Sequence, residues 1–189
     1  MALDPTEKII RALARKTLTR DTLTARRAAE ILGQTTGFIY HHWGSFDGLM
    51  LATSARGWER LVAAITAAYD EKSDPFAIPV GFLQFTIDFP EIYWLLAERP
   101  LDKDAVRHYL KEHGHLPAYT AWKAYKALLG RAAPHATGTD SRLLHAAIHG
   151  LASQLQMGQI APVAPDRQTE VNYALGLARE VGKRFLAKH

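Results

Sequence analysis

The chain has 189 residues, of which 48% are hydrophobic and 22% charged, so it can bury a core of useful size. It contains no cysteine, which excludes a disulfide framework, a thiol nucleophile and a cysteine zinc site and suits a reducing cytoplasm. The first thirty residues mix charges throughout, and no apolar run approaches the roughly 20 residues that cross a bilayer. We therefore expect a cytoplasmic protein without a membrane segment.

The positive charge gathers near the N-terminus, while the whole chain carries a modest net charge of +4. A single acid, Asp21, lies among the cations Lys8, Arg11, Arg15, Lys16, Arg20, Arg26 and Arg27. Such a cluster is either a solvated helix face or a surface that meets phosphates of a nucleic acid.

Helical periodicity dominates the chain, with no strand-like alternation of any length, so the expected fold class is all-α. Asp4-Pro5 and Thr24 predict helix starts, Gly33 predicts a helix end, and Thr35 predicts the next cap. The predicted helices cover about residues 5–17, 24–33, 35–42, 45–70, 76–88, 91–98, 103–129, 140–160 and 167–187.

Proline marks the breaks in the second half of the chain. Breaks are expected at Ser73-Asp74-Pro75 and around Pro162, and Pro117 predicts a kink or a split within 103–129. The long fourth helix is expected to join a DNA-binding domain at residues 1–50 to a helical effector-binding and dimerisation domain at residues 51–189.

Residues 24–49 form two short predicted helices joined by a glycine turn, followed by the start of a third helix. Their characteristic positions are Thr24, Ala28-Ala29, Gly33-Gln34-Thr35, Gly37-Phe38-Ile39-Tyr40, Trp43, Ser45-Phe46-Asp47 and Leu49. This segment resembles the helix-turn-helix of the TetR family of bacterial transcriptional regulators. It departs from the family pattern at Gln34, which replaces an apolar turn residue, and at Phe46, which replaces a lysine. Residues 88–94 and 147–151 resemble the family's ligand-binding body more faintly.

The resemblance implies that the third helix enters the major groove of double-stranded DNA. The candidate DNA-binding residues are Thr24, Arg26, Arg27, Thr35, Thr36, Gly37, Phe38, Tyr40, His41 and His42. Gly37 either allows close approach to DNA or packs against the second helix. Phe38 either contacts thymine methyl groups or is a core residue. No metal site is predicted at the histidine pair, because adjacent side chains on a helix point about 100° apart.

Aromatic side chains concentrate in the second half of the chain, where they either form a core or line a pocket. The resemblance favours a pocket for a small apolar or aromatic effector. Its candidate residues are Phe85, Phe89, Trp94, His108, Tyr109, Trp122, Tyr125 and His149. His145 and His149 are four residues apart but lack the intervening Glu of a zincin motif, so they are expected to be ordinary core or surface histidines.

The helices at 140–160 and 167–187 carry apolar stripes interleaved with the small residues Ala147, Gly150, Gly176 and Gly182. These stripes pack either within the chain or, as the resemblance implies, against a second copy in a four-helix dimer interface. The predicted function is a homodimeric, ligand-responsive repressor of an inverted-repeat operator, with no cofactor and no enzymatic activity, because no phosphate loop or nucleophile elbow is present. The alternative is a helical interaction module whose helix-turn-helix does not bind DNA.

Overall fold

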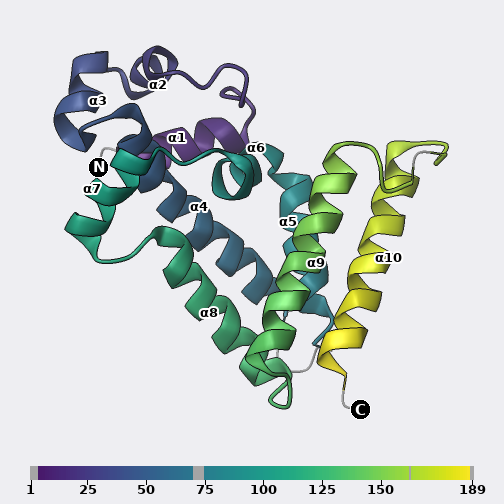
Figure 1. Cartoon of the computed structure of the whole chain (residues 1–189). Helices are drawn as coiled ribbons and strands as arrows, with labels where there is room; N and C mark the ends of the chain where they lie inside the picture. Colours follow the sequence, from purple (N-terminus) through teal and green to yellow (C-terminus); the bar gives the residue numbers. More distant parts are fainter. Residues whose placement is uncertain (1–3, 70–74, 162, 188–189) are drawn as a thin grey trace. The chain divides into compact units, whose positions relative to one another are not determined.

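A computed structural model describes residues 4–69, 75–161 and 163–187, and every regular element in these ranges is a helix (Figure 1). The all-α class expected from the sequence is therefore confirmed. The elements are α1 Pro5–Ala14, α2 Ala25–Leu32, α3 Thr36–Trp43, α4 Phe46–Ala68, α5 Ala77–Asp88, α6 Pro90–Tyr93, the π-helix η1 Trp94–Glu98, α7 Lys103–His113, α8 Pro117–Ala132, α9 Gly138–Gln156 and α10 Arg167–Leu186.

The chain divides into two compact units. Unit 1 comprises the described residues up to Arg60 together with Glu91–Trp122, and unit 2 comprises Leu61–Pro90 together with the described residues from Lys123 onward. Both α4 and α8 contribute residues to each unit. The domain boundary expected after residue 50 falls within α4 and remains a prediction.

The first three helices start and end largely where the capping residues predict. Asp4 accepts a hydrogen bond from the Thr6 amide at 2.9 Å, and Pro5 occupies the first turn of α1. The Thr24 hydroxyl accepts from an amide in the first turn of α2, and Gly33 ends that helix at φ 69°, a left-handed conformation that glycine adopts without strain. Thr35 occupies the cap position of α3, but its hydroxyl makes no capping hydrogen bond.

Helix α1 ends at Ala14, three residues before the predicted Thr17. The reason is the turn that follows, in which Lys16 takes φ 56° and the amides of Thr17 and Leu18 both donate to the Ala12 carbonyl. This turn buries the Leu18 side chain completely, so a core contact replaces the last helical turn.

Unit 2 is built around α5, α9 and α10, which pack against one another, with α9 and α10 antiparallel (Figure 1). Its fully buried residues include Ile78, Leu83, Leu144, Ile148, Ala174 and Ala178. A reciprocal capping box between Thr137 and Asp140 starts α9, and the Asp166 carboxylate caps α10. Gly182 allows α10 to approach α5 closely, because a Cβ atom there would lie 2.8 Å from Cγ of Pro79.

Proline splits the predicted 103–129 helix as expected. Helix α7 ends before Gly114, whose φ is 76°, and α8 begins at Pro117. The predicted 91–98 helix is a short α-helix that continues as the π-helix η1. The breaks at Ser73-Asp74 and Pro162, and the predicted helix end at Asp70, lie outside the described residues.

Candidate DNA-binding surface and ligand cavities

The α2–α3 pair is held by a small apolar core. Ala28, Ala29 and Leu32 face inward from α2, as the sequence predicted, and Ile39 is the one residue of α3 that is fully buried. The rest of α3 therefore lies at the surface or is only half-buried. This arrangement leaves one long side of α3 available to a partner.

The first turn of α3 is exposed and unconstrained. Thr35, Thr36 and Gly37 are all exposed, and both hydroxyl-bearing side chains lie at the end of the helix that reaches base edges in a helix-turn-helix. A Cβ atom at Gly37 would meet only Oγ1 of Thr35, at an ordinary 3.6 Å. Packing against α2 therefore does not explain this glycine, and close approach to a partner remains a prediction.

Aromatic rings cover the C-terminal half of α3. The Phe38 ring lies 4.0 Å from the His42 ring and 5.8 Å from the Trp43 ring, centroid to centroid. Nδ1 of His42 lies 3.0 Å from the Phe38 carbonyl oxygen. Phe38 is half-buried in this stack, so it shapes the helix surface besides being a candidate contact, whereas Tyr40 is 52% exposed and His41 is also exposed.

Two arginines at the start of α2 share one carboxylate. Arg26 Nε lies 3.3 Å from Oε1 of Glu30, and Arg27 Nη1 lies 2.9 Å from Oε2 of the same residue. The Arg27 hydrogen bond is the main reason that the pKa of Glu30 lies below its usual range. The Arg26 side chain is 88% exposed, so an incoming phosphate or guanine can compete for it with a solvated carboxylate.

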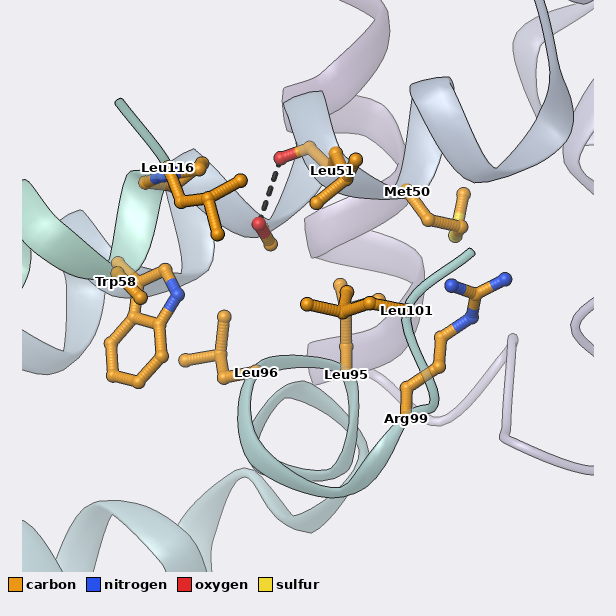
Figure 2. Close-up of a pocket in the computed structure, with 11 residues that line it drawn as sticks. Met50, Leu51, Trp58, Leu95, Leu96, Arg99, Leu101 and Leu116 are labelled. Atoms are coloured by element: carbon orange, nitrogen blue, oxygen red, sulfur yellow. Dashed lines mark hydrogen bonds between the residues drawn. The ribbon is translucent and has the colours of Figure 1, made fainter. Parts of the chain in front are cut away.

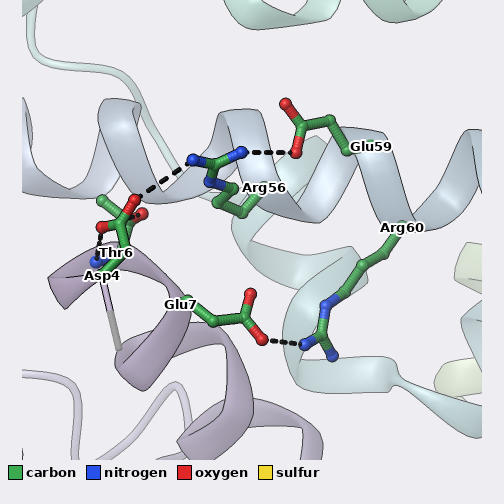
Figure 3. Close-up of polar contacts among 6 residues, drawn as sticks. All are labelled: Asp4, Thr6, Glu7, Arg56, Glu59 and Arg60. Atoms are coloured by element: carbon green, nitrogen blue, oxygen red, sulfur yellow. Dashed lines mark hydrogen bonds and ion pairs between the residues drawn. The ribbon is translucent and has the colours of Figure 1, made fainter. Parts of the chain in front are cut away.

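Part of the N-terminal cation cluster serves the fold. Nζ of Lys8 donates to the last carbonyl of α2, that of Leu32, at 3.4 Å, and Arg11 pairs with Glu7 at 2.8 Å. Glu7 also accepts from Arg60 of α4 at 2.6 Å (Figure 3). Arg15, Lys16 and Arg20 remain exposed. The phosphate-facing interpretation remains a prediction for these three exposed residues.

Arg99, which the sequence analysis did not single out, packs against the first turn of α4. Its guanidinium lies 5.8 Å from the centroid of the Phe46 ring and forms an ion pair with Asp47. The family pattern has a phosphate-contacting lysine at position 46, and here a half-buried aromatic ring receives an arginine from within the same unit. In the sequence, the replacement of a lysine by Phe46 marked this position as unusual but did not identify Arg99.

A small apolar cavity of about 40 Å³ lies in unit 1 between α4, η1 and the start of α8 (Figure 2). It is lined by Met50, Leu51, Ser54, Trp58, Leu95, Leu96, Arg99, Leu101, Leu116, Pro117 and Ala118. The Ser54 hydroxyl donates to the Leu51 carbonyl at 2.7 Å, so this polar group in the wall is already satisfied. The volume suits about one water-sized molecule, far below that of a typical ligand pocket.

A second and larger cavity in unit 1, which we call the polar cleft, has a volume of about 480 Å³. It lies among α1, α3, α4 and α7 and is lined by Asp4, Thr6, His42, Trp43, Gly48, Ala52, Ala55, Arg56, Glu59, Ala105, His108, Tyr109, Glu112 and His113. Two of the eight predicted effector residues, His108 and Tyr109, are among them. The other lining residues were not predicted as effector contacts. They bring the start of α1 and the end of α3 together with α4 and with α7, which lies much further along the chain.

The other six predicted effector residues line neither of these cavities. Trp94 and Trp122 belong to unit 1, and the remaining four to unit 2. In unit 2 the Phe85 and Phe89 rings lie 5.2 Å apart, and the Tyr125 ring packs 5.9 Å from the His145 ring. Burial lowers the pKa of His145 below its usual range and raises that of Tyr125. Phe85 and Tyr125 are buried, so these two predicted effector residues belong to the core of unit 2.

The outer faces of α9 and α10 expose apolar side chains and open glycines. Leu143 and Tyr173 are 50% and 54% exposed, and a Cβ atom at Gly150 or Gly176 would meet nothing within 4 Å. Gly182, predicted with them, instead packs within the chain. Among the described residues, no cluster of three or more potential ligands is placed to hold a metal ion, and no helix is long and apolar enough to cross a membrane.

Neither a family model nor a curated protein matches this chain. Solved structures match it along nearly its whole length. A TetR-like transcriptional regulator from Rhodococcus sp. RHA1 has a TM-score of 0.59 at 18% identity, covering 98% of this chain and 94% of its own. The TetR-family regulator PfmR from Thermus thermophilus has a TM-score of 0.55 at 15% identity, covering 99% of this chain and 100% of its own.

The chain has the TetR-family fold. The resemblance seen in residues 24–49 therefore extends to the architecture of the whole chain. The same fold is shared by a protein named superantigen PfiT, with a TM-score of 0.54 at 19% identity, covering 92% of this chain and 93% of its own. Because a fold hosts more than one function, the function of this TetR-fold protein has to be argued from its surfaces.

Proposed function

We propose that this chain is a homodimeric DNA-binding transcriptional regulator, a repressor that leaves an inverted-repeat operator when it binds a small apolar or aromatic effector. The observation that carries the proposal is the surface of α3. Thr35, Thr36, Gly37 and Tyr40 are exposed at a helix with a single fully buried residue, and no packing within the described chain explains them. A helix of this kind fits the major groove of DNA.

The side chains of this surface match the chemistry of the groove. Threonine hydroxyls bond bases or phosphates, while their methyl groups meet thymine methyls. Arg26 carries the planar guanidinium that binds guanine through two hydrogen bonds, and Arg27 and Tyr40 are placed to meet phosphates. His41, His42 and the Thr24 cap complete the proposed contact surface, beside the half-buried Phe38.

The test is binding of the protein to DNA from upstream of its own gene, followed by fluorescence anisotropy. Arg26→Ala is expected to weaken operator binding by about 1–3 kcal/mol and to relax sequence preference. Arg107→Ala is the matched control, since Arg107 is also exposed, at 75%, and also pairs with an acid one helical turn away. Equal affinities of the Arg26 variant and the native protein for the operator would remove Arg26 from the interface.

The dimer is proposed to form through α9 and α10. Their exposed Leu143 and Tyr173 provide apolar area, and the open Gly150 and Gly176 allow helices of a second copy to approach closely. A two-fold dimer would present both copies of α3 to half-sites about 34–36 Å apart or at a multiple of that spacing.

Light scattering with Tyr173→Glu tests the interface. This variant is expected to shift the dimer toward monomer at micromolar concentration, because the new carboxylate would be buried without a partner. Tyr119→Glu is the control, since Tyr119 is 50% exposed on α8. A native protein that is monomeric at this concentration, or an equal shift in both variants, would contradict the proposed interface.

The second candidate function, an interaction module without DNA binding, is favoured by one observation. Phe46 is covered by Arg99 where the family pattern has a lysine for phosphate, and Gln34 is exposed in the turn. Absence of any salt-dependent binding to the upstream DNA would select this candidate.

A further inference from the structure

We propose that the polar cleft of unit 1 is the effector site and that it binds a small organic cation carrying an aromatic ring. The binding itself stands on the geometry of the cleft alone. Its consequence for DNA rests on the function proposed above.

The cleft has the size of a ligand site. Its volume of about 480 Å³ falls within the roughly 300–1,000 Å³ of small-molecule pockets. The apolar cavity beside η1 measures about 40 Å³ and is too small for such a ligand. Of these two cavities, the cleft is therefore the one that can admit an effector.

The charges of the cleft favour a cation. Asp4, Glu59 and Glu112 line it, with Arg56 as the permanent cation among the lining residues. Arg56 is already held by two carboxylates, that of Asp4 at 3.1 Å and that of Glu59 at 2.9 Å (Figure 3). The hydrogen bonds that Arg56 donates, the one to Glu59 first, raise the pKa of its guanidinium. Three carboxylates thus face one arginine among the lining residues, so the permanent charges of the cleft favour a cation over an anion.

The remaining walls suit an aromatic body. Ala52, Ala55 and Ala105 are small apolar residues of the lining, and the aromatic residues Trp43 and Tyr109 also line the cleft. An aromatic face attracts an organic cation through its quadrupole, and the attraction grows as the pair is desolvated. Tyr109 is half-buried and stacks on the His113 ring with centroids 4.1 Å apart, so its ring is held in place.

The cleft also touches the end of the recognition helix. His42 and Trp43 are the last residues of α3, and the same His42 ring stacks on Phe38 in the proposed DNA surface. On the other wall, His108 and Glu112 of α7 are paired at 3.2 Å. A ligand between α3 and α7 thus contacts the helix that is proposed to bind DNA. Such a ligand can have different affinities for the DNA-bound and the DNA-free protein, which is what regulation requires.

The test uses two probes of nearly equal shape, (4-hydroxyphenyl)trimethylammonium and the uncharged 4-tert-butylphenol. Binding to the ¹⁵N-labelled native protein is followed by amide chemical shifts. We expect the cation to bind more tightly than the phenol and to shift the amides of Gly48, Ala52 and Ala105. Glu112→Gln and Glu59→Gln should each lower the affinity for the cation by roughly three- to tenfold, because each removes one nearby negative charge. The affinity for the uncharged phenol should stay the same. Glu180→Gln on α10 is the control. It removes a carboxylate paired with Lys183 and should change the affinity for neither probe.

Three results would overturn the proposal: no saturable binding of the cation, equal binding of the two probes, or a cation affinity that Glu112→Gln and Glu59→Gln leave unchanged. The operator arm is separate. Saturating cation should change operator affinity, and operator should change cation affinity by the same factor. An unchanged operator affinity with the cation in the cleft overturns its effector role. If the cation binds there and no upstream DNA is bound, the site stands and the proposed function fails.

Discussion

Gly182 offers a test of the packing between α5 and α10, because alanine at this position has too little room. Its Cβ would lie 2.8 Å from Cγ of Pro79 and 3.5 Å from Cα of Phe76. Neither neighbour is the free end of a flexible side chain, since one belongs to a proline ring and the other to the backbone. Gly182→Ala should therefore push the two helices apart.

The magnitude follows from two opposing effects. Alanine stabilises a helix by about 0.5–1 kcal/mol relative to glycine. Overpacking a core costs about 1–3 kcal/mol. Gly130 of α8 serves as the control, because a Cβ atom there meets nothing within 4 Å. Both variants gain the stabilisation that alanine gives a helix. The difference between their unfolding free energies is therefore the packing cost, about 1–3 kcal/mol.

The assay is thermal unfolding by circular dichroism at one fixed protein concentration. We expect the midpoint of Gly182→Ala to lie below that of Gly130→Ala by about 2–12 °C, at roughly 2–4 °C per kcal/mol for a chain of this size. Gly130→Ala should match or exceed the native protein. Equal midpoints for the two variants would refute the close α5–α10 approach.

Three further predictions concern the burial of Ile39 and the pKa values of His145 and Glu7. Ile39→Ala should cost about 2–5 kcal/mol of unfolding free energy in urea and abolish operator binding, because α3 has no other fully buried residue. Burial lowers the pKa of His145, so the unfolded chain takes up this proton first, and unfolding free energy should fall from about pH 7 to 5, with a flatter profile in His145→Gln. The pKa of Glu7 lies below its usual range because hydrogen bonds from Arg11 and Arg60 outweigh its burial, so its stabilisation is lost as pH falls from about 5 to 3. Arg60→Met should reduce that loss by up to about 1 kcal/mol in acid denaturation.

Local signals predicted the helices well. Capping residues and prolines act within a few positions of themselves, so Thr24, Gly33 and Pro117 each marked a boundary that the structure has. The end of α1 was missed because burial of Leu18 decides it, and burial depends on what packs there. The same limit applies to Gly182, whose partner on α5 is about a hundred residues away in sequence.

The candidate site shows the same difference between features set by neighbouring residues and features set by residues distant in the sequence. The exposed face of α3 follows from the helical period, so Thr35, Thr36 and Tyr40 could be named in advance. The polar cleft could not, because its walls come from four helices and its charge depends on Arg56 being held by two acids. The aromatic residues predicted as effector contacts were selected by residue type, and two of them, Phe85 and Tyr125, are buried in the core of unit 2.

The sparse anchoring of α3 explains why a ligand in the cleft would have leverage over DNA binding. The helix has eight residues, and Ile39 is its only fully buried one, so few contacts within the chain fix its orientation. Its C-terminal end carries the stack of Phe38, His42 and Trp43, and the last two of these residues line the cleft. A molecule that packs against those two residues therefore contacts the end of α3 directly. Because a shift of about 1.4 kcal/mol in this balance changes an affinity tenfold, modest contacts in the cleft are enough to regulate the proposed DNA surface.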